Sequence, residues 1–349
     1  MTQKIPVGIL GATGMVGQKF VELLSCHPWF EIVALAASDR SVGKSYGDAM
    51  KWAMPTSLPQ ALAEMPVVPC LPGLSCQIVF SGLDSSVAGE IEKNFALAGY
   101  QVISNSSNHR MDPTVPLLVP EINGEHLKLL PHQNFGKGAL ITNPNCSVIG
   151  ITLALKPLLD KWGLEAVHIV TLQALSGAGY PGIPSMDILD NVIPYIAGEE
   201  SKIETEPLKI LGTFQENKIA PYPLHLSAQC TRVSVADGHL ACVSVKLKKE
   251  ATRKEIITAW KEFAAEPQHL NLPSAPKTPI IYLEDERHPQ PKLHRNLEGG
   301  MATSIGRLRE CPLFGWKFVV LSHNTVRGAA GCAILNAELL VKKGYAPSC

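Results

Sequence analysis

Several features that mark particular classes of protein are missing from this 349-residue sequence. Its 31 basic residues balance 31 acidic ones, and lysine and arginine form no stripe. Proteins that bind nucleic acid or anionic membranes usually carry such a stripe, so the sequence predicts neither partner. No apolar run reaches membrane-spanning length, and the first residues lack the charged and apolar regions of a secretion signal.

The cysteines also lack the spacing of a disulfide framework or a zinc site. There are nine, an odd number, at scattered positions, and none forms a Cys-x-x-Cys pair. This pattern is typical of free thiols in a reducing compartment, so we expect a cytoplasmic protein with no structural metal. With 46% hydrophobic residues, the chain has enough apolar surface to form two packed domains.

The first 145 residues alternate short apolar runs with helical patterns. The run over 5–10 passes through GATGMVG into a helix-like segment, and apolar runs follow at 31–37, 76–83, 100–107 and 139–145, with an amphipathic stretch at 86–98. Apolar strands that alternate with helices predict an α/β fold with a Rossmann-like, doubly wound parallel sheet.

Beyond residue 146 the pattern changes. Runs over 165–175, 240–249 and 316–324 alternate apolar and polar residues, which predicts half-exposed strands and a second, α+β domain. Residues 176–230 are rich in glycine, proline and charge, so we expect an active-site loop with helical pieces. The segment 328–344 predicts a long helix that returns to the first domain.

A glycine turn follows the first predicted strand. Gly11, Gly14 and Gly17 form G-x-x-G-x-x-G at a strand-to-helix junction, where missing Cβ atoms let the backbone approach a pyrophosphate. A plain structural turn is the alternative, but the position after the first strand favours a dinucleotide. At the end of the second strand, Arg40 between serines favours NADP, unless Arg40 is only a solvated turn residue.

Cys146 stands where an extended run becomes a helical one, with Asn145 or Ser147 as a possible cap. Pro157 is expected to kink or end this helix. Unpaired N–H groups and the positive end of the helix favour a thiolate and an oxyanion. The sequence position alone does not separate a nucleophile from a packed cysteine.

Polar residues elsewhere favour the nucleophile. Gln173 stands in an otherwise apolar strand, and Arg232 and His239 mark the two ends of RVSVADGH. A cysteine with a distant histidine is the minimum for thiolate catalysis, because the histidine can accept and return a proton. A histidine in a surface turn is the alternative for His239.

Many blocks of the sequence match one family in order. They include GILGATGMVGQKF, AASDRSVGKSYGDAMKW, VFSGLDSSVAGEIE, ITNPNCS, LQALSGAGYPG, GEESKIETEPLKIL, TRVSVADGH and NTVRGAAG. The chain resembles aspartate-semialdehyde dehydrogenases of the archaeal and fungal branch, nearly from end to end. The resemblance implies an N-terminal NADP-binding domain over 1–145 plus 325–349. It also implies a catalytic and dimerisation domain over 146–324, of the type found in glyceraldehyde-phosphate dehydrogenase.

The resemblance further implies a reaction and its residues. NADPH would reduce L-aspartyl 4-phosphate to L-aspartate 4-semialdehyde through a thioester on Cys146, reversibly, in lysine, threonine and methionine biosynthesis. Gln173 would orient the acyl group and His239 would be the acid/base. For the substrate, the resemblance implies Arg232 on the α-carboxylate, Glu199 (or Glu200) on the ammonium, and Lys202, Arg110 and Asn145 on the phosphate. For the cofactor, it implies Gly11, Thr13, Gly14, Met15, Val16, Ser38, Arg40, Ser41, Ser81, Gly82, Ser176, Gly177 and Asn324.

Two rival functions would use these residues differently. A malonyl-CoA reductase would use the same thioester chemistry without binding an amino group or phosphate, and Glu199, Lys202 and Arg110 argue against it. A non-catalytic NADP-binding sensor would leave Cys146 and its polar partners without a shared purpose. The resemblance also implies a homodimer or homotetramer joined through the second domain's sheet, and the sequence does not choose between the two.

Overall fold

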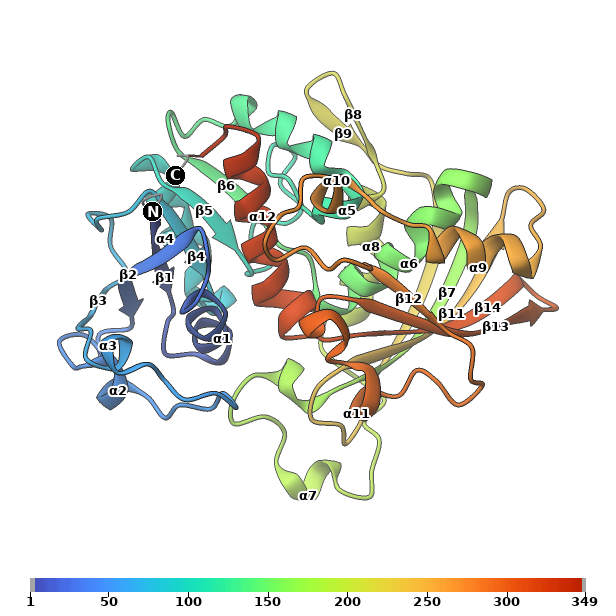
Figure 1. Cartoon of the computed structure of the whole chain (residues 1–349), viewed down its shortest axis with the longest axis horizontal. Coiled ribbons are helices and arrows are strands. Elements are labelled where there is room, and N and C mark those ends of the chain that lie inside the picture. Colours follow the sequence, from blue (N-terminus) through green and yellow to red (C-terminus); the bar gives the residue numbers. More distant parts are fainter. Residues whose placement is uncertain (1–3, 347–349) are drawn as a thin grey trace.

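The computed structural model describes residues 4–346 and places two six-stranded sheets side by side (Figure 1). The predicted domain 1–145 plus 325–349 includes residues 1–3 and 347–349, which lie outside the described residues. In the first sheet all strands are parallel, in the order β3-β2-β1-β4-β5-β6. The strands are β1 (Ile5–Leu10), β2 (Phe30–Ala37), β3 (Val67–Pro69), β4 (Ile78–Ser81), β5 (Gln101–Ser104) and β6 (Ala139–Thr142).

The strand order of this sheet reverses between β1 and β4. Ligands of doubly wound sheets bind at such a switch point, outside the carboxyl ends of the strands. The segment after β1 leads into α1, and the segment after β4 leads into α4, so both loops border the switch point. The helical elements of this part are α1 (Met15–Leu24), α2 (Tyr46–Ala49), α3 (Gln60–Ala63), α4 (Ser85–Leu97), α5 (Pro120–Asn123) and η1 (Gly124–His132).

The second sheet is mixed, in the order β10-β7-β11-β14-β13-β12. Its strands are β7 (Leu164–Gln173), β10 (His225–Arg232), β11 (His239–Leu247), β12 (Ile280–Leu283), β13 (Thr303–Cys311) and β14 (Gly315–Ser322). A small hairpin of β8 (Thr213–Gln215) and β9 (Lys218–Ala220) lies outside it. Along β7 and β11 buried residues alternate with half-buried or exposed ones, which matches the predicted alternation.

The helix α6 (Cys146–Trp162) packs in the core of the second domain, with Val148, Ile149 and Ile151 buried in the same apolar cluster as residues of β7 and β11. It continues through Pro157, so the alternative that the helix ends there is wrong. Burial of nearly every side chain from Ser147 to Leu158 stabilises the helix against the loss of one backbone hydrogen bond.

The C-terminal segment packs between the two sheets (Figure 1). It begins with a π-helical turn, η4 (Val326–Ala330), and continues as α12 (Gly331–Lys342), so the predicted single helix over 328–344 is divided. Side chains of α12 such as Leu335 join β1 residues in the first apolar core. The last part of the chain therefore packs against the apolar core of the first sheet.

The remaining elements surround the second sheet. They are η2 (Leu175–Ala178), α7 (Ser185–Ile188), α8 (Glu199–Ile210), α9 (Arg253–Lys261), α10 (Glu266–His269), α11 (Pro291–His294) and η3 (Leu297–Gly300). No helix among residues 4–346 is long and apolar enough to cross a membrane. Within the same residues, no three metal-ligating side chains converge.

Candidate active site

A cavity of about 950 Å³ opens between the switch point of the first sheet and the start of α6. It extends from the first residues of α1 to the second domain, so one elongated molecule can contact both. Of the predicted residues, the following line it: Met15, Val16, Arg110, Asn145, Cys146, Ser176, Gly177, Glu199, Lys202, Arg232 and Asn324.

Cys146 is the first residue of α6 and is half-buried at the cavity wall. Asn145 is the N-cap, because its Oδ1 accepts hydrogen bonds from the backbone N–H groups of Ser147 (2.9 Å) and Val148 (3.3 Å). Gly328 of η4 packs so closely that an added Cβ would lie 2.9 Å from Cys146 Cβ. The thiol thus sits at the positive end of a capped helix, with one flank closed by backbone.

The charged groups around Cys146 have opposite effects on the pKa of its thiol. Burial, and after it the Glu199 carboxylate, raise the pKa of the thiol, while Arg110, Arg232 and Lys202 lower it, and the net result is a pKa of about 12. The free protein therefore holds a protonated thiol at neutral pH. A ligand that neutralises Glu199 would remove one of the two contributions that disfavour the thiolate.

His239 begins β11 and lies behind the cavity wall. Its Nδ1 accepts a hydrogen bond from the Ala174 backbone N–H (3.0 Å), which places the proton of the neutral ring on Nε2. Burial first, then the charges of Arg232 and His323, lower the pKa of His239 to about 3. Nε2 is buried and has no hydrogen-bond partner among residues 4–346. The ring thus presents an unused N–H donor.

Gln173 and Asn145 converge on one carboxylate oxygen of Glu199. Asn145 Nδ2 donates to Glu199 Oε1 at 2.8 Å, and Gln173 Nε2 donates to the same oxygen at 3.1 Å. The second oxygen, Oε2, accepts from Lys202 Nζ at 3.4 Å. The carboxylate is therefore held in place from one side and faces an exchangeable ammonium on the other.

The geometry distinguishes Glu199 from Glu200, which the sequence left as alternatives for binding the ammonium. Glu199 is buried at the cavity, whereas the Oε1 of Glu200 accepts from the Cys230 backbone N–H on β10 (3.0 Å). Glu200 thus ties α8 to the sheet, which favours Glu199 as the group that meets a ligand.

Arg232 is the last residue of β10 and is buried at the cavity wall. Its Nη1 donates to the Ala174 backbone oxygen at 2.7 Å, which leaves other N–H groups of the guanidinium for a carboxylate. A Cβ on Gly177 would lie 2.9 Å from Arg232 Nη1 and 3.0 Å from His239 Nε2. Gly177, predicted as a cofactor contact, is thus also the residue that lets the loop approach both side chains.

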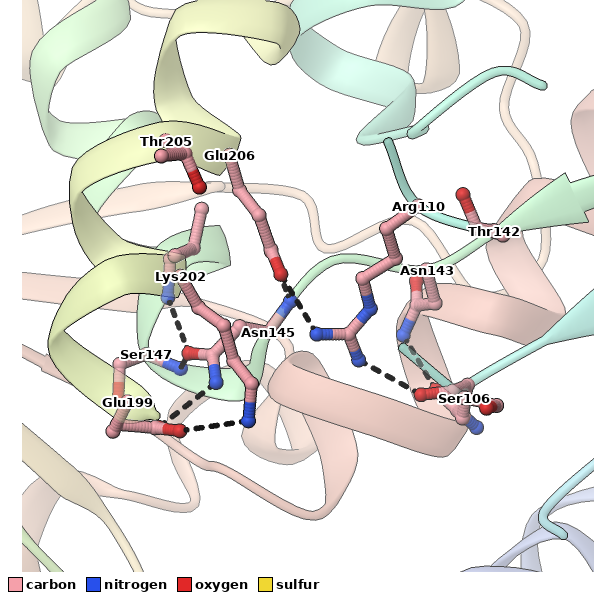
Figure 2. A network of polar contacts seen from close by, with 12 residues as sticks. Ser106, Arg110, Thr142, Asn143, Asn145, Ser147, Glu199, Lys202, Thr205 and Glu206 are labelled. Atoms are coloured by element: carbon pink, nitrogen blue, oxygen red, sulfur yellow. Dashed lines mark hydrogen bonds and ion pairs between the residues drawn. The ribbon is translucent and has the colours of Figure 1, made fainter. Parts of the chain in front are cut away.

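Arg110 is buried beside Asn145 and is held by two acceptors (Figure 2). Its Nη1 donates to Glu206 Oε1 (2.9 Å) and its Nη2 to the Asn105 backbone oxygen (2.8 Å). The other Glu206 oxygen accepts from the Asn145 backbone N–H at 2.7 Å. Glu206 had no assigned role from sequence. Its place four residues after Lys202 and three residues after Ile203 on α8 is the signal that could have found it.

The three glycines of the turn meet different surroundings. Gly11 has φ +73° and a Cβ there would lie 2.9 Å from Gly82 backbone, while a Cβ on Gly17 would lie 2.1 Å from the Gly11 oxygen. On Gly14 the nearest atom would be 3.5 Å away. Two glycines are thus required by the protein's own packing. Gly14 is exposed at the N-cap of α1 and leaves room for a ligand.

The other predicted cofactor residues differ in their exposure and in their contacts. Ser38 and Arg40 are exposed and Ser41 is buried just beyond β2, while Thr13 is half-buried in the glycine turn. Ser81 is buried, and its hydroxyl donates to Glu92. Gly82 packs against the start of α1, and Asn324 Nδ2 donates to Ser176 Oγ at 2.8 Å.

The fold and the site together define a class of protein. A Rossmann-like domain with an open glycine turn meets a second domain at one cavity, and a cysteine stands there with a buried histidine and arginine. This is the architecture of a two-domain, nucleotide-dependent oxidoreductase that works through a covalent thiol.

Comparison with known proteins confirms the class and narrows it. The family model described as "Semialdehyde dehydrogenase, NAD binding domain" matches residues 6–130, and that described as "Semialdehyde dehydrogenase, dimerisation domain" matches 155–327. The aspartate-semialdehyde dehydrogenase of Schizosaccharomyces pombe is 49% identical over 97% of this chain and 98% of its own. The aspartate-semialdehyde dehydrogenase of Archaeoglobus fulgidus is 48% identical over 97% of this chain and 98% of its own. The chain belongs to the aspartate-semialdehyde dehydrogenase family.

Solved structures agree with this. The aspartate-semialdehyde dehydrogenase of Candida albicans with NADP has a TM-score of 0.91 and 42% identity, over 98% of this chain and 100% of its own. Aspartate semialdehyde dehydrogenase II of Vibrio cholerae, complexed with ASA, has a TM-score of 0.77 and 26% identity, over 98% and 99%. The predicted family and fold class are both confirmed.

Proposed function

We propose that this chain catalyses its family's reaction, the reversible NADPH-dependent conversion of L-aspartyl 4-phosphate into L-aspartate 4-semialdehyde and phosphate, in lysine, threonine and methionine biosynthesis. The observation that carries the proposal is the convergence of Cys146, Glu199 and Arg232 on one cavity that also reaches the glycine turn. A thiol, a carboxylate and a guanidinium match the acyl, ammonium and carboxylate groups of an aspartyl substrate.

The residues present fit NADP as the cofactor. No side chain of the described residues caps the N-terminus of α1, so its first backbone N–H groups are available to a pyrophosphate, and Gly14 leaves space beside them. We assign Gly11, Thr13, Gly14, Met15 and Val16 to this part. Ser38, Arg40 and Ser41 suit the added phosphate, and the remaining assigned contacts are Ser81, Gly82, Ser176, Gly177 and Asn324.

In the reductive direction the Cys146 thiol loses its proton to the departing phosphate, and the sulfur attacks the acyl carbon of the aspartyl phosphate. The C–S bond forms, the C–O bond to phosphate breaks, and Arg110, Lys202 and the Asn145 region hold the departing phosphate. When bound, NADPH supplies the hydride that reduces the thioester. The C–S bond then breaks as the carbonyl re-forms, which returns the electron pair to the Cys146 sulfur and releases the aldehyde.

The other side chains hold the substrate and its charge. Arg232 clamps the α-carboxylate, Glu199 takes the ammonium in place of Lys202, and Gln173 orients the acyl group. The Nε2–H of His239 lies next to Gly177 of the cavity wall, and in this proposal it donates to the oxygen that becomes negatively charged. Because Nδ1 accepts from Ala174, the resting tautomer supports the donor half of the predicted acid/base role.

We further propose a homodimer or homotetramer, with 1–145 plus 325–349 as the NADP-binding domain and 146–324 as the catalytic and dimerisation domain. One face of the second sheet is only half-buried, and Met186, Leu189, Val192 and Tyr195 are large exposed apolar side chains in the same domain. The cysteines among residues 4–346 are all free, which suits a cytoplasmic enzyme. Mass in solution from sedimentation would decide between dimer and tetramer.

Phosphate-dependent reduction of NADP by L-aspartate 4-semialdehyde tests the function. The wild type should require phosphate, and Cys146→Ser should lose activity by at least ~10³-fold because a serine hydroxyl is a far weaker nucleophile than a thiolate. Binding of NADP to the variant should persist. An inactive wild type, or an unimpaired Cys146→Ser, would contradict the proposal, as would a preference for malonyl-CoA.

A further inference from the structure

A ladder of charged residues runs along one face of α8. Glu199, Lys202, Glu206 and Lys209 follow one another at intervals of three, four and three residues, which places them on the same side of a helix. Glu199 and Lys202 line the cavity. Glu206 and Lys209 are buried further along the helix, and the mechanism above does not use them.

Glu206 is enclosed between two groups of the phosphate-binding region (Figure 2). Its Oε1 accepts from Arg110 Nη1 at 2.9 Å, and its Oε2 accepts from the Asn145 backbone N–H at 2.7 Å. The side chain is 2% exposed. Each carboxylate oxygen therefore has its own donor, and the two donors belong to segments that are 35 residues apart in the sequence.

Lys209 fixes the backbone of the same region. Its Nζ donates to three backbone oxygens of one segment, those of Arg110 (2.7 Å), Asp112 (2.7 Å) and Val115 (2.8 Å). All three ammonium donors are thus used. The segment that carries Arg110 is held twice by α8, through its backbone by Lys209 and through its guanidinium by Glu206.

We propose that Glu206 is a positioning residue of the phosphate subsite, which acts by orienting the Arg110 guanidinium and the Asn145 backbone next to Cys146. This proposal rests on the proposed function, because it takes Arg110 as a phosphate ligand. Charge alone would give the opposite expectation: a carboxylate near a phosphate dianion repels it. The contacts favour orientation, since both oxygens are already bound to donors.

Glu206→Gln separates orientation from charge. A glutamine keeps the shape of the side chain, but one of its two polar atoms is an NH₂ group, which must face either Arg110 or the Asn145 N–H, donor against donor. Loss of a hydrogen bond to a charged group should raise the KM for phosphate about tenfold or more. The KM for L-aspartate 4-semialdehyde should change less than twofold. Glu204→Gln is the matched control, because Glu204 lies on the same helix and accepts from the Ala228 backbone N–H on β10.

A double-variant cycle tests whether Glu206 acts through Arg110. In an Arg110→Gln background, Glu206→Gln should add much less to the KM for phosphate than in the wild type, because the charged group that it positions is gone. Glu206→Asp keeps the carboxylate and should give an intermediate KM for phosphate. This variant can also replace Glu206→Gln in the test if the glutamine variant fails to fold. Protection of Cys146 from iodoacetamide by inorganic phosphate gives the same comparison without turnover.

The outcomes are distinct. A phosphate-specific rise in KM that vanishes in the Arg110→Gln background supports the proposal. A fall in the KM for phosphate would overturn it in favour of simple repulsion, and an equal change in every kinetic constant would overturn it in favour of a purely structural role. If the wild type needs no phosphate at all, the proposed function has failed instead.

Discussion

The two ends of the cavity are built in different ways. At the Cys146 end, side chains are buried and bound to one another before any ligand arrives, as Glu199 is by Asn145 and Gln173. At the nucleotide end, the candidate contacts include backbone groups, such as those of Gly14, and exposed side chains, such as that of Arg40. Chemistry requires fixed geometry, whereas a phosphate can be held by a turn and a helix terminus. Substitutions at the two ends should therefore fail in different ways.

The largest expected effect comes from adding a side-chain atom at the Cys146 end of the cavity, where the side chains are already bound to one another. Gly177→Ala places a Cβ 2.9 Å from Arg232 Nη1 and 3.0 Å from the His239 ring, so both side chains must move. Displacement of this order at reacting groups should lower kcat/KM for the semialdehyde at least ~10²-fold. Steady-state kinetics and thermal melting would check this. Ala178→Gly, in the same exposed loop, is the control, and unchanged kinetics of Gly177→Ala would show that this end is not tightly packed.

The second prediction concerns the pH dependence of the half-buried Cys146 thiol. The pKa of Cys146 is raised to about 12, so below that pH the thiolate fraction grows with every pH increase. Alkylation of Cys146 by iodoacetamide, followed by mass spectrometry of its peptide, should speed up about tenfold per pH unit between pH 7 and 9. Glu199→Gln should speed it further, because the charge that raises this pKa is removed. A plateau below pH 9 would mean that the free protein already holds a thiolate.

The two ends also differ in what the sequence could predict. The periodic apolar runs predicted both sheets, and GATGMVG predicted the turn, because these features depend on neighbours in the chain. Glu206 was not found, since its partners Arg110 and Asn145 lie 96 and 61 residues away. The π turn at Gly328 was also missed, because it is set by packing against Cys146 rather than by its own residues.

The third prediction, with a smaller expected effect, is that substitutions of Gly14 and Gly17 change different properties, NADP affinity and stability respectively. Within the described part of the chain, the Cβ of Gly14→Ala meets no atom closer than 3.5 Å, so the thermal stability of this variant should match that of the wild type while NADP affinity falls about tenfold. Gly17→Ala would place its Cβ 2.1 Å from the Gly11 oxygen and should instead destabilise the fold. Calorimetric titration with NADP and thermal melting measure the two effects. Equal losses of stability would show that Gly14 also serves packing.

The smallest effect is expected where the side chains are most exposed. Ser38 and Arg40 project from the loop after β2, where water screens charge and a single ion pair contributes little. Arg40→Ala should lower the ratio of kcat/KM for NADP to that for NAD only severalfold, with the value for NAD unchanged, because NAD lacks the phosphate that Arg40 would meet. Lys93→Ala, which removes an exposed charge on α4, should leave the ratio as it is. An unchanged ratio in Arg40→Ala would make Arg40 a solvated turn residue, and the preference for NADP would then have to come from backbone and serine groups at this end of the cavity.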